Sequence, residues 1–186
     1  MRYPKYGFTL IELIVGIMLL AVALTSILGL LINQAPQAVD PVQQVRAAQL
    51  AQRLAGEILQ KSFDELSAHN GGYYRCGEQI AELEIPLCSI TYGPDGESAP
   101  YAYNDVDDFD TAGKWLDASW LTQTAEGING EEYRNYRVRI AVSAVDFRSG
   151  ILLICTTPCS IGKLIKLQIQ LPDESVLDFA FYRGNY

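Results

Sequence analysis

The chain has 186 residues, with 14 basic and 22 acidic side chains and a formal net charge of −8 at pH 7. Nucleic-acid binding depends on Lys and Arg neutralising phosphates, so we expect no nucleic-acid partner for this acidic chain. The length suits one modest domain plus an anchor, and the sequence contains no internal repeat or low-complexity tract.

A long apolar run lies close to the N-terminus. Residues 8–32 contain one ionisable side chain, Glu12, and residues 13–32 contain none. About 20 apolar residues span a bilayer as a helix, so we predict a transmembrane helix over residues 8–32. Arg2 and Lys5 precede it without any acid, which predicts a cytoplasmic N-terminus and export of the rest. A core helix or a cleaved signal peptide is the alternative, but the run is longer than the usual signal-peptide core.

The junction before this run resembles the type IV prepilin signature. Residues 5–13 read KYGFTLIEL, which combines a short basic leader, a Gly/Phe junction and a glutamate four residues after the Phe. The resemblance covers residues 5–32. It implies that a membrane prepilin peptidase removes the leader, residues 1–7, by cutting between Gly7 and Phe8, and that the same enzyme N-methylates Phe8.

The resemblance also implies a location and partners. The chain would cross the inner membrane once, with its N-terminus cytoplasmic and its head periplasmic, and would then enter an extracellular pilus. Its partners would be the prepilin peptidase/N-methyltransferase, other pilins that contact its N-terminal helix, the inner-membrane assembly machinery and membrane lipid. In this family a glutamate at the position of Glu12 pairs with the amino terminus of a neighbouring subunit during assembly.

Glu12 is also a functional candidate on physical grounds. An ionised side chain within a bilayer costs at least ~2.5–3.5 kcal/mol. The simpler interpretation is that the carboxylate reaches the headgroups. A cut after Gly7 would give Phe8 an α-amine with a pKa of about 7.7–8.0, which is largely cationic at neutral pH. Opposite charges held away from water attract strongly, so we assign Glu12 to assembly.

The next segment predicts a second helical half. Pro36 and Pro41 lack backbone donors, which indicates a kink or a short break, and Asp40 suits an N-cap for a restart. From residue 42 to 66, apolar side chains recur every three or four residues, so we predict an amphipathic periplasmic helix within residues 33–66. Its apolar stripe is expected to pack on the head, with a partner-binding stripe as the alternative.

Residues 67–186 are predicted to form a globular head with antiparallel strands. Alternating apolar side chains predict strands over residues 134–147, 163–171 and 176–183, and a short one over residues 83–87. The turn at 172–175 makes the last two long strands a hairpin. The fold class is therefore α+β and type IV pilin-like, with a long N-terminal helix on an antiparallel sheet.

Four aspartates lie close together in the stretch NDVDDFD, at Asp105, Asp107, Asp108 and Asp110. Calcium takes several oxygen ligands, so this density is compatible with a calcium loop, although it lacks the EF-hand spacing. A solvated acidic turn is the competing interpretation. No other cofactor is expected, and His69, the only histidine, is expected to be solvated.

The four cysteines predict disulfides, because the count is even and the periplasm is oxidising. Of three possible connectivities we favour Cys76–Cys88 and Cys155–Cys159, since each closes a short loop. A zinc site is the less favoured alternative.

No nucleophile elbow, phosphate loop or histidine constellation is present, so no enzyme is predicted. The stretches RAAQLAQRLAGEILQKSFDEL and DVDDFD resemble a minor pilin of the mannose-sensitive haemagglutinin (MSHA) type, MshD-like, which implies a role in pilus initiation, assembly or adhesion. Two alternatives remain open, a minor pseudopilin of a type II secretion system and a single-span periplasmic binding or sensor module.

Overall fold

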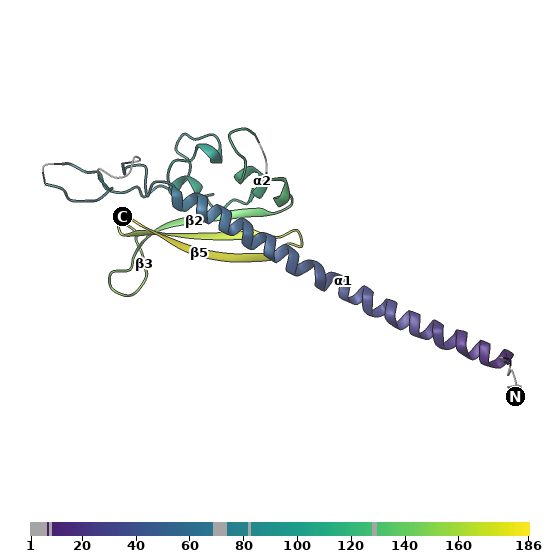
Figure 1. The fold of residues 1–186 in the computed structure, drawn as a ribbon. Helices are drawn as coiled ribbons and strands as arrows, with labels where there is room; N and C mark the ends of the chain where they lie inside the picture. The colour runs from purple at the N-terminus through teal and green to yellow at the C-terminus, as the bar shows by residue number, and fades with distance from the viewer. Residues whose placement is uncertain (1–6, 8, 69–73, 82, 128–129) are drawn as a thin grey trace, which may run out of the picture. The chain divides into compact units, whose positions relative to one another are not determined.

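Helix α1, Leu10–Gln60, is the longest element of the fold (Figure 1). The computed structural model describes residues 7, 9–68, 74–81, 83–127 and 130–186, and of residues 30–40 only the backbone. The chain divides into two compact units, residues 1–42 and 43–186, and each is described by itself.

The predicted break at the prolines is wrong, because α1 is helical throughout Leu10–Gln60. A proline removes one helical hydrogen bond, and the turns on either side can keep the helix together. A kink at Pro36 or Pro41 stays a prediction.

The predicted end of this helix at residue 66 is also wrong, since α1 ends at Gln60. The chain then pairs with a distant segment. Ser62 N donates to Asn104 O at 3.1 Å, and Val106 N donates to Ser62 O at 3.1 Å. These bonds hold Ser62 beside residues 104–106. The chain beyond Gln60 therefore leaves the helix, although its apolar residues keep helical spacing.

The sheet has the strand order β1-β2-β4-β5, and β3 also pairs with β2. Its long strands are β2 (Arg137–Asp146), β4 (Gly162–Gln170) and β5 (Val176–Gly184), all antiparallel to their neighbours. Opposite ends of β2 pair with two short strands, β1 (Leu116–Asp117) and β3 (Leu153–Ile154). The three long predicted strands are confirmed to within a few residues at their ends.

The short elements lie in the segment between α1 and β2. They are η1 (Pro100–Ala102), η2 (Asp107–Phe109), α2 (Ala118–Leu121) and η3 (Glu131–Tyr133). The strand expected at residues 83–87 is absent from the described residues, where only an isolated bridge joins Ile80 to Leu83.

The core of the head lies between one face of the sheet and the last turns of α1. Buried side chains of the helix meet buried side chains of β2 and β4: Ala47, Leu50, Ala51, Leu54 and Ile58 with Val138, Ile140, Val142, Ile165, Leu167 and Ile169. The apolar period of the helix and the two-residue period of the strands therefore share one interior. This confirms the α+β class, with an N-terminal apolar helix and an antiparallel sheet.

Candidate functional site

The predicted processing site lies at the start of the described chain. Gly7 is exposed, and a Cβ added to it would meet no atom within 4 Å. Phe8 lies outside the described residues. Glu12 is exposed in the first turn of α1, and its backbone N–H donates to Thr9 O at 3.1 Å. The acid therefore stands at the N-terminal end of the helix, where unsatisfied N–H groups favour negative charge.

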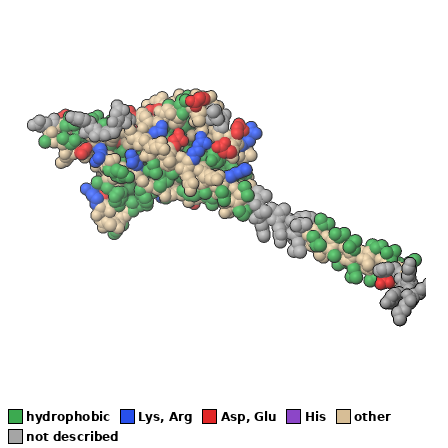
Figure 2. All heavy atoms as spheres, in the orientation of Figure 1, with side chains coloured by type: hydrophobic (Ala, Val, Ile, Leu, Met, Phe, Trp, Pro, Cys, Tyr) green, Lys and Arg blue, Asp and Glu red, His purple; other side chains and the backbone are tan. Residues whose placement is uncertain are grey.

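The helix behind Glu12 is long and apolar enough to cross a membrane from Leu10 to Gly29, among the residues described. None of its side chains is buried by the rest of the chain, so its apolar surface is open on all sides. Figure 2 shows this described segment with hydrophobic side chains along it and acidic atoms near its N-terminal end. The apolar helix and the signal before it indicate membrane anchoring.

The head contains a charge cluster centred on Lys163, which is fully buried in β4. Its ammonium group donates to Phe63 O at 2.6 Å, Asp64 Oδ2 at 3.0 Å and Asp107 Oδ2 at 2.6 Å. It also lies 4.6 Å from the centre of the Phe63 ring. All three ammonium donors are thus satisfied by the chain itself. The cluster joins the segment after α1, the η2 turn and the sheet.

Burial is the largest influence on the pKa values of two acids in and beside this cluster, Asp107 and Asp105. It raises the pKa of Asp107 to about 7, against the charge and hydrogen bond of Lys163 and helped by the charges of Asp105 and Asp64. Burial, with the charge of Asp108, also raises the pKa of Asp105 to about 6. Carboxylates are disfavoured where water is excluded, so these two acids lose their protons at a higher pH than exposed aspartates do.

The aspartate-rich stretch is buried rather than a solvated turn. Asp105 Oδ1 accepts the backbone N–H groups of Asp107 and Asp108 at 2.6 and 3.1 Å. In return, Asp108 Oδ2 accepts the N–H groups of Asn104 and Asp105 at 2.8 and 3.3 Å. These reciprocal bonds fold the η2 turn and explain why aspartates occupy it.

Three of the four predicted calcium ligands, Asp105, Asp107 and Asp108, line one hollow of about 230 Å³. Asp110 does not line it. Its Oδ2 accepts Val142 N at 2.8 Å and its Oδ1 accepts Ala112 N at 2.7 Å, so it caps an edge of β2. Calcium binding by these four residues stays a prediction.

Both predicted disulfides are confirmed: Cys76 pairs with Cys88 and Cys155 with Cys159. The first bond is buried and lies with Phe63 in a small separate core. The second lies in the exposed connection between β2 and β4, next to four exposed apolar residues, Ile151–Ile154. His69, the other residue considered for zinc, lies outside the described residues.

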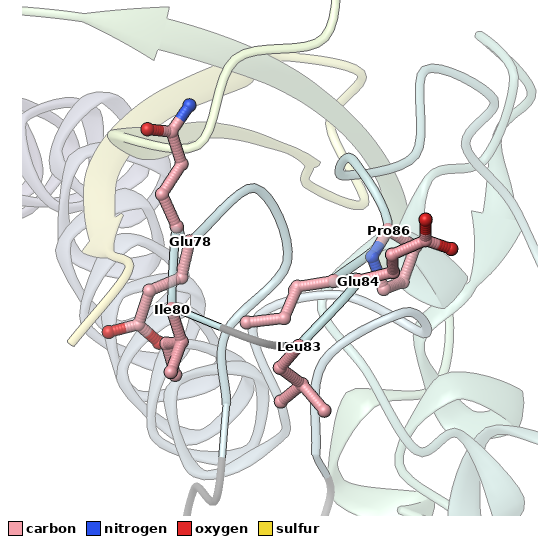
Figure 3. Close-up of a pocket in the computed structure, with 7 residues that line it drawn as sticks. Glu78, Ile80, Leu83, Glu84 and Pro86 are labelled. Carbon is pink, nitrogen blue, oxygen red and sulfur yellow. The ribbon is translucent and has the colours of Figure 1, made fainter.

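An open hollow of about 650 Å³ lies within the loop closed by Cys76 and Cys88 (Figure 3). The labelled side chains that line it, from Glu78 to Pro86, come from this one loop and are largely exposed. Residue 82, inside the loop, is outside the description. Among the described residues no second segment lines it, so we assign no site to this hollow.

Sequence reasoning missed the Lys163 cluster, although a signal for it was present. Lys163 stands two residues before Ile165, and hence on the core-facing side of a strand whose side chains alternate. A lysine there needs a buried acid, since burial of an unpaired charge is costly. The alternation of side chains in the strand does not predict which acids these are, and the structure shows Asp64 and Asp107.

Comparison with known proteins found one match. Residues 2–28 match the family model described as the prokaryotic N-terminal methylation motif. No curated protein and no solved structure matches the chain. The N-terminus therefore carries a prepilin-type signal, which implies processing by a prepilin peptidase and supports a pilin- or pseudopilin-like subunit.

Proposed function

We propose that this chain, which carries the methylation motif over residues 2–28, is a minor type IV pilin. Its peptidase would cut between Gly7 and Phe8 and methylate Phe8, and the mature subunit would enter a pilus assembled from the inner membrane. One observation carries the proposal: the motif includes most of an apolar helical span, Leu10–Gly29, whose one ionisable side chain is Glu12 in the first turn. An acid at this place suits a contact with the new amine of another subunit.

The proposed orientation in the membrane follows from the positive charges of the leader. Arg2 and Lys5 keep the leader in the cytoplasm, so the head with its disulfides is delivered to the oxidising periplasm. Other pilins would contact the helix, and the inner-membrane assembly machinery would extract the subunit from lipid. A structural subunit needs no catalytic group, and we propose no enzymatic activity.

The head supports minor rather than major status. It has long irregular connections, and its disulfides are two short local loops rather than one C-terminal pair. The stretches at residues 46–66 and 105–110 are those that resemble MSHA-type minor pilins. Initiation, assembly or adhesion within such a pilus is the role we propose. A type II secretion pseudopilin uses the same N-terminal signal and is the competing assignment.

The mass of the N-terminal peptide tests this function. We expect chains from membranes and from sheared pili to begin with N-methylated Phe8. Gly7→Glu places a charged side chain at the junction and should leave the leader attached, whereas Gly7→Ala should be cleaved in part. Recovery of Met1 on chains from assembled pili, or an unmethylated uncleaved chain throughout, would contradict the assignment and favour a single-span binding or sensor module.

A further inference from the structure

A second hollow in the head, of about 300 Å³, is lined by residues at the end of α1 and at the end of β5. Three groups of described residues line it: residues 60–63, residues 67, 68, 74 and 75, and residues 183, 185 and 186. Asn185 joins the C-terminal residues to the residue after Arg75 and to the connection before β4, because its Nδ2 donates to Cys76 O at 3.2 Å and to Ser160 O at 2.9 Å. Ser67 Oγ accepts Cys76 N at 3.1 Å on the opposite side of the same cysteine. The hollow is therefore built by hydrogen bonds and the neighbouring disulfide.

The charge of this hollow differs from that of the whole chain. Lys61, Arg75 and Arg183 line it, whereas none of its described lining residues is an Asp or a Glu. None of these three cations makes an ion pair with another described residue. Asp64, close by in sequence, is already bound to Lys163 and Ser89. Lys61 Nζ already donates to the backbone oxygen of Tyr103. Among the described residues, this chain of net charge −8 therefore places two guanidinium groups without an ion-pair partner, those of Arg75 and Arg183, around one hollow.

Arg183 adds an independent observation. Its Nε is buried and has no hydrogen-bond partner among the described residues. Arg183 follows Leu177, Phe179 and Phe181 at alternate positions of β5, so its side chain lies on the same face as theirs, at the end of the row that packs on the core. Arg183 as a whole is half-buried, and its guanidinium carbon lies 5.5 Å from the centre of the Tyr186 ring. A buried N–H donor without an acceptor is costly, and such groups are normally satisfied by a protein group, a water or a bound ion.

The other walls are aromatic and hydroxylic. Tyr74, Tyr186 and Phe63 contribute rings, and Ser62 and Ser67 contribute hydroxyl groups. A guanidinium suits a carboxylate, since its planar donors match the two oxygens. Rings and hydroxyls suit a small polyhydroxylated ligand with an apolar face. Ligand pockets range from about 300 to 1,000 Å³, so this hollow fits a single ring rather than a polymer.

We propose that this hollow binds a sugar acid, with Arg183 and Arg75 on its carboxylate and the tyrosine rings against its sugar ring. This binding site is separate from the processing signal and does not depend on the assignment of the chain as a minor pilin.

Titration calorimetry of the full chain in detergent micelles tests the site with three probes. Glucuronate has the ring and the carboxylate, glucose has the ring alone, and acetate has the carboxylate alone. We expect glucuronate to bind more tightly than either of the others, and Arg183→Gln to weaken it about tenfold or more. Arg134→Gln is the matched control, because Arg134 is highly exposed outside the hollow, and it should bind glucuronate like the unaltered chain.

Each other outcome overturns the proposal. Equal affinity for glucose and glucuronate would show that the carboxylate contributes nothing to binding. Equal affinity for acetate and glucuronate would show that the sugar ring contributes nothing and that the hollow is only an anion site. Absence of glucuronate binding at millimolar concentration would reject the site altogether. If Arg183→Gln fails to fold, as judged by loss of the Cys76–Cys88 bond, Arg75→Gln replaces it, because Arg75 is exposed on a loop. Glucuronate binding unchanged in a folded Arg75→Gln chain would then refute the proposal.

Discussion

Lys163 is the residue on which the interior charge of the head depends. Its ammonium is fully buried, yet it has three acceptors, of which two are carboxylates and one is a backbone oxygen. Buried ion pairs are weak evidence for net stability, because desolvation offsets much of the attraction. Removal of one partner is different, since it leaves an uncompensated charge in the interior.

We therefore predict that Lys163→Met destabilises the head by about 3–5 kcal/mol. The substitution keeps the length of the side chain but leaves Asp64 and Asp107 without their cation. Chemical unfolding followed by tryptophan fluorescence measures the change. Lys166→Met is the control, because Lys166 is exposed three residues later in the same strand, and it should change stability by less than about 0.5 kcal/mol. Equal losses in the two variants would show that Lys163 is not the counter-ion of the cluster.

The same cluster predicts a dependence of stability on pH. The pKa of Asp107 is about 7 in the fold against 3.8 ordinarily, so between these values the folded state binds more protons than the unfolded state. The contribution of Asp107 to the free energy of unfolding is therefore full at low pH and falls as pH rises towards 7. We expect a loss on the order of 2 kcal/mol between pH 5 and pH 8 from this group.

Asp107→Asn isolates this contribution, because asparagine keeps a carbonyl oxygen for Lys163 and does not titrate. Unfolding curves of both chains across the pH range should show a flatter profile for the variant in the interval from about pH 4 to pH 7. Parallel profiles would mean that Asp107 does not hold a proton in the folded head.

At the scale of elements, hydrophobic periodicity predicted the long strands and did not predict the short ones. Strands of nine or ten residues that alternate apolar and polar side chains, as β2 and β5 do, were predicted nearly to their ends. Strands β1 and β3 have two residues each and no period of their own, and they exist because β2 offers unpaired edge groups at both ends. The end of α1 was missed for the same reason, since pairing of Ser62 with the 104–106 segment overrides the local helical pattern.

The helix within the head is predicted to be held by one stripe. Leu54 is fully buried against the sheet, whereas Leu59 on the same helix is 37% exposed. Leu54→Ala should cost about 2–5 kcal/mol of head stability, because it leaves a cavity in a packed core. Leu59→Ala makes the same chemical change at a site open to water and should cost clearly less. Urea unfolding measures the free energy of unfolding of both variants. A similar loss of stability in the two would show that the buried apolar stripe of α1 does not run through Leu54.

At the scale of the whole molecule, the N-terminal signal was the most predictable part. Its spacing at residues 7, 8 and 12 is local, so the sequence alone carries it. The buried cluster joins Lys163 to acids 99 and 56 positions away, and the cationic hollow joins residues of the segment 60–75 to Arg183, Asn185 and Tyr186, so no local pattern predicts which residues meet. The sequence thus predicted the signal formed by neighbouring residues, and it did not predict contacts between residues far apart in the chain.

Glu12→Val tests the whole molecule as a subunit. The change removes the only charge in the span, so membrane insertion should be as good as before or better. The amine of Phe8 in another subunit would lose its partner only in the filament, where water is excluded. We expect normal export, near-normal cleavage, intact disulfides and poor incorporation into pili. The ratio of the protein in sheared pili to that in membranes measures this.

Glu12→Asp is the matched variant, because it keeps the charge with a shorter reach, and it should retain part of the incorporation. A Glu12→Val chain that enters pili at the unaltered ratio would remove Glu12 from assembly.

The position of Lys163 in the sequence also fixes the order of events during synthesis. The ribosome releases a chain from its N-terminus, so Asp64, Cys76, Cys88 and Asp107 emerge well before Lys163 and the central strand β4. The two acids are separated from their cation by 99 and 56 positions. A nascent chain halted before β4 therefore lacks both the central strand of the core and the cation of the cluster. We expect the head to complete its core only after β4 has emerged.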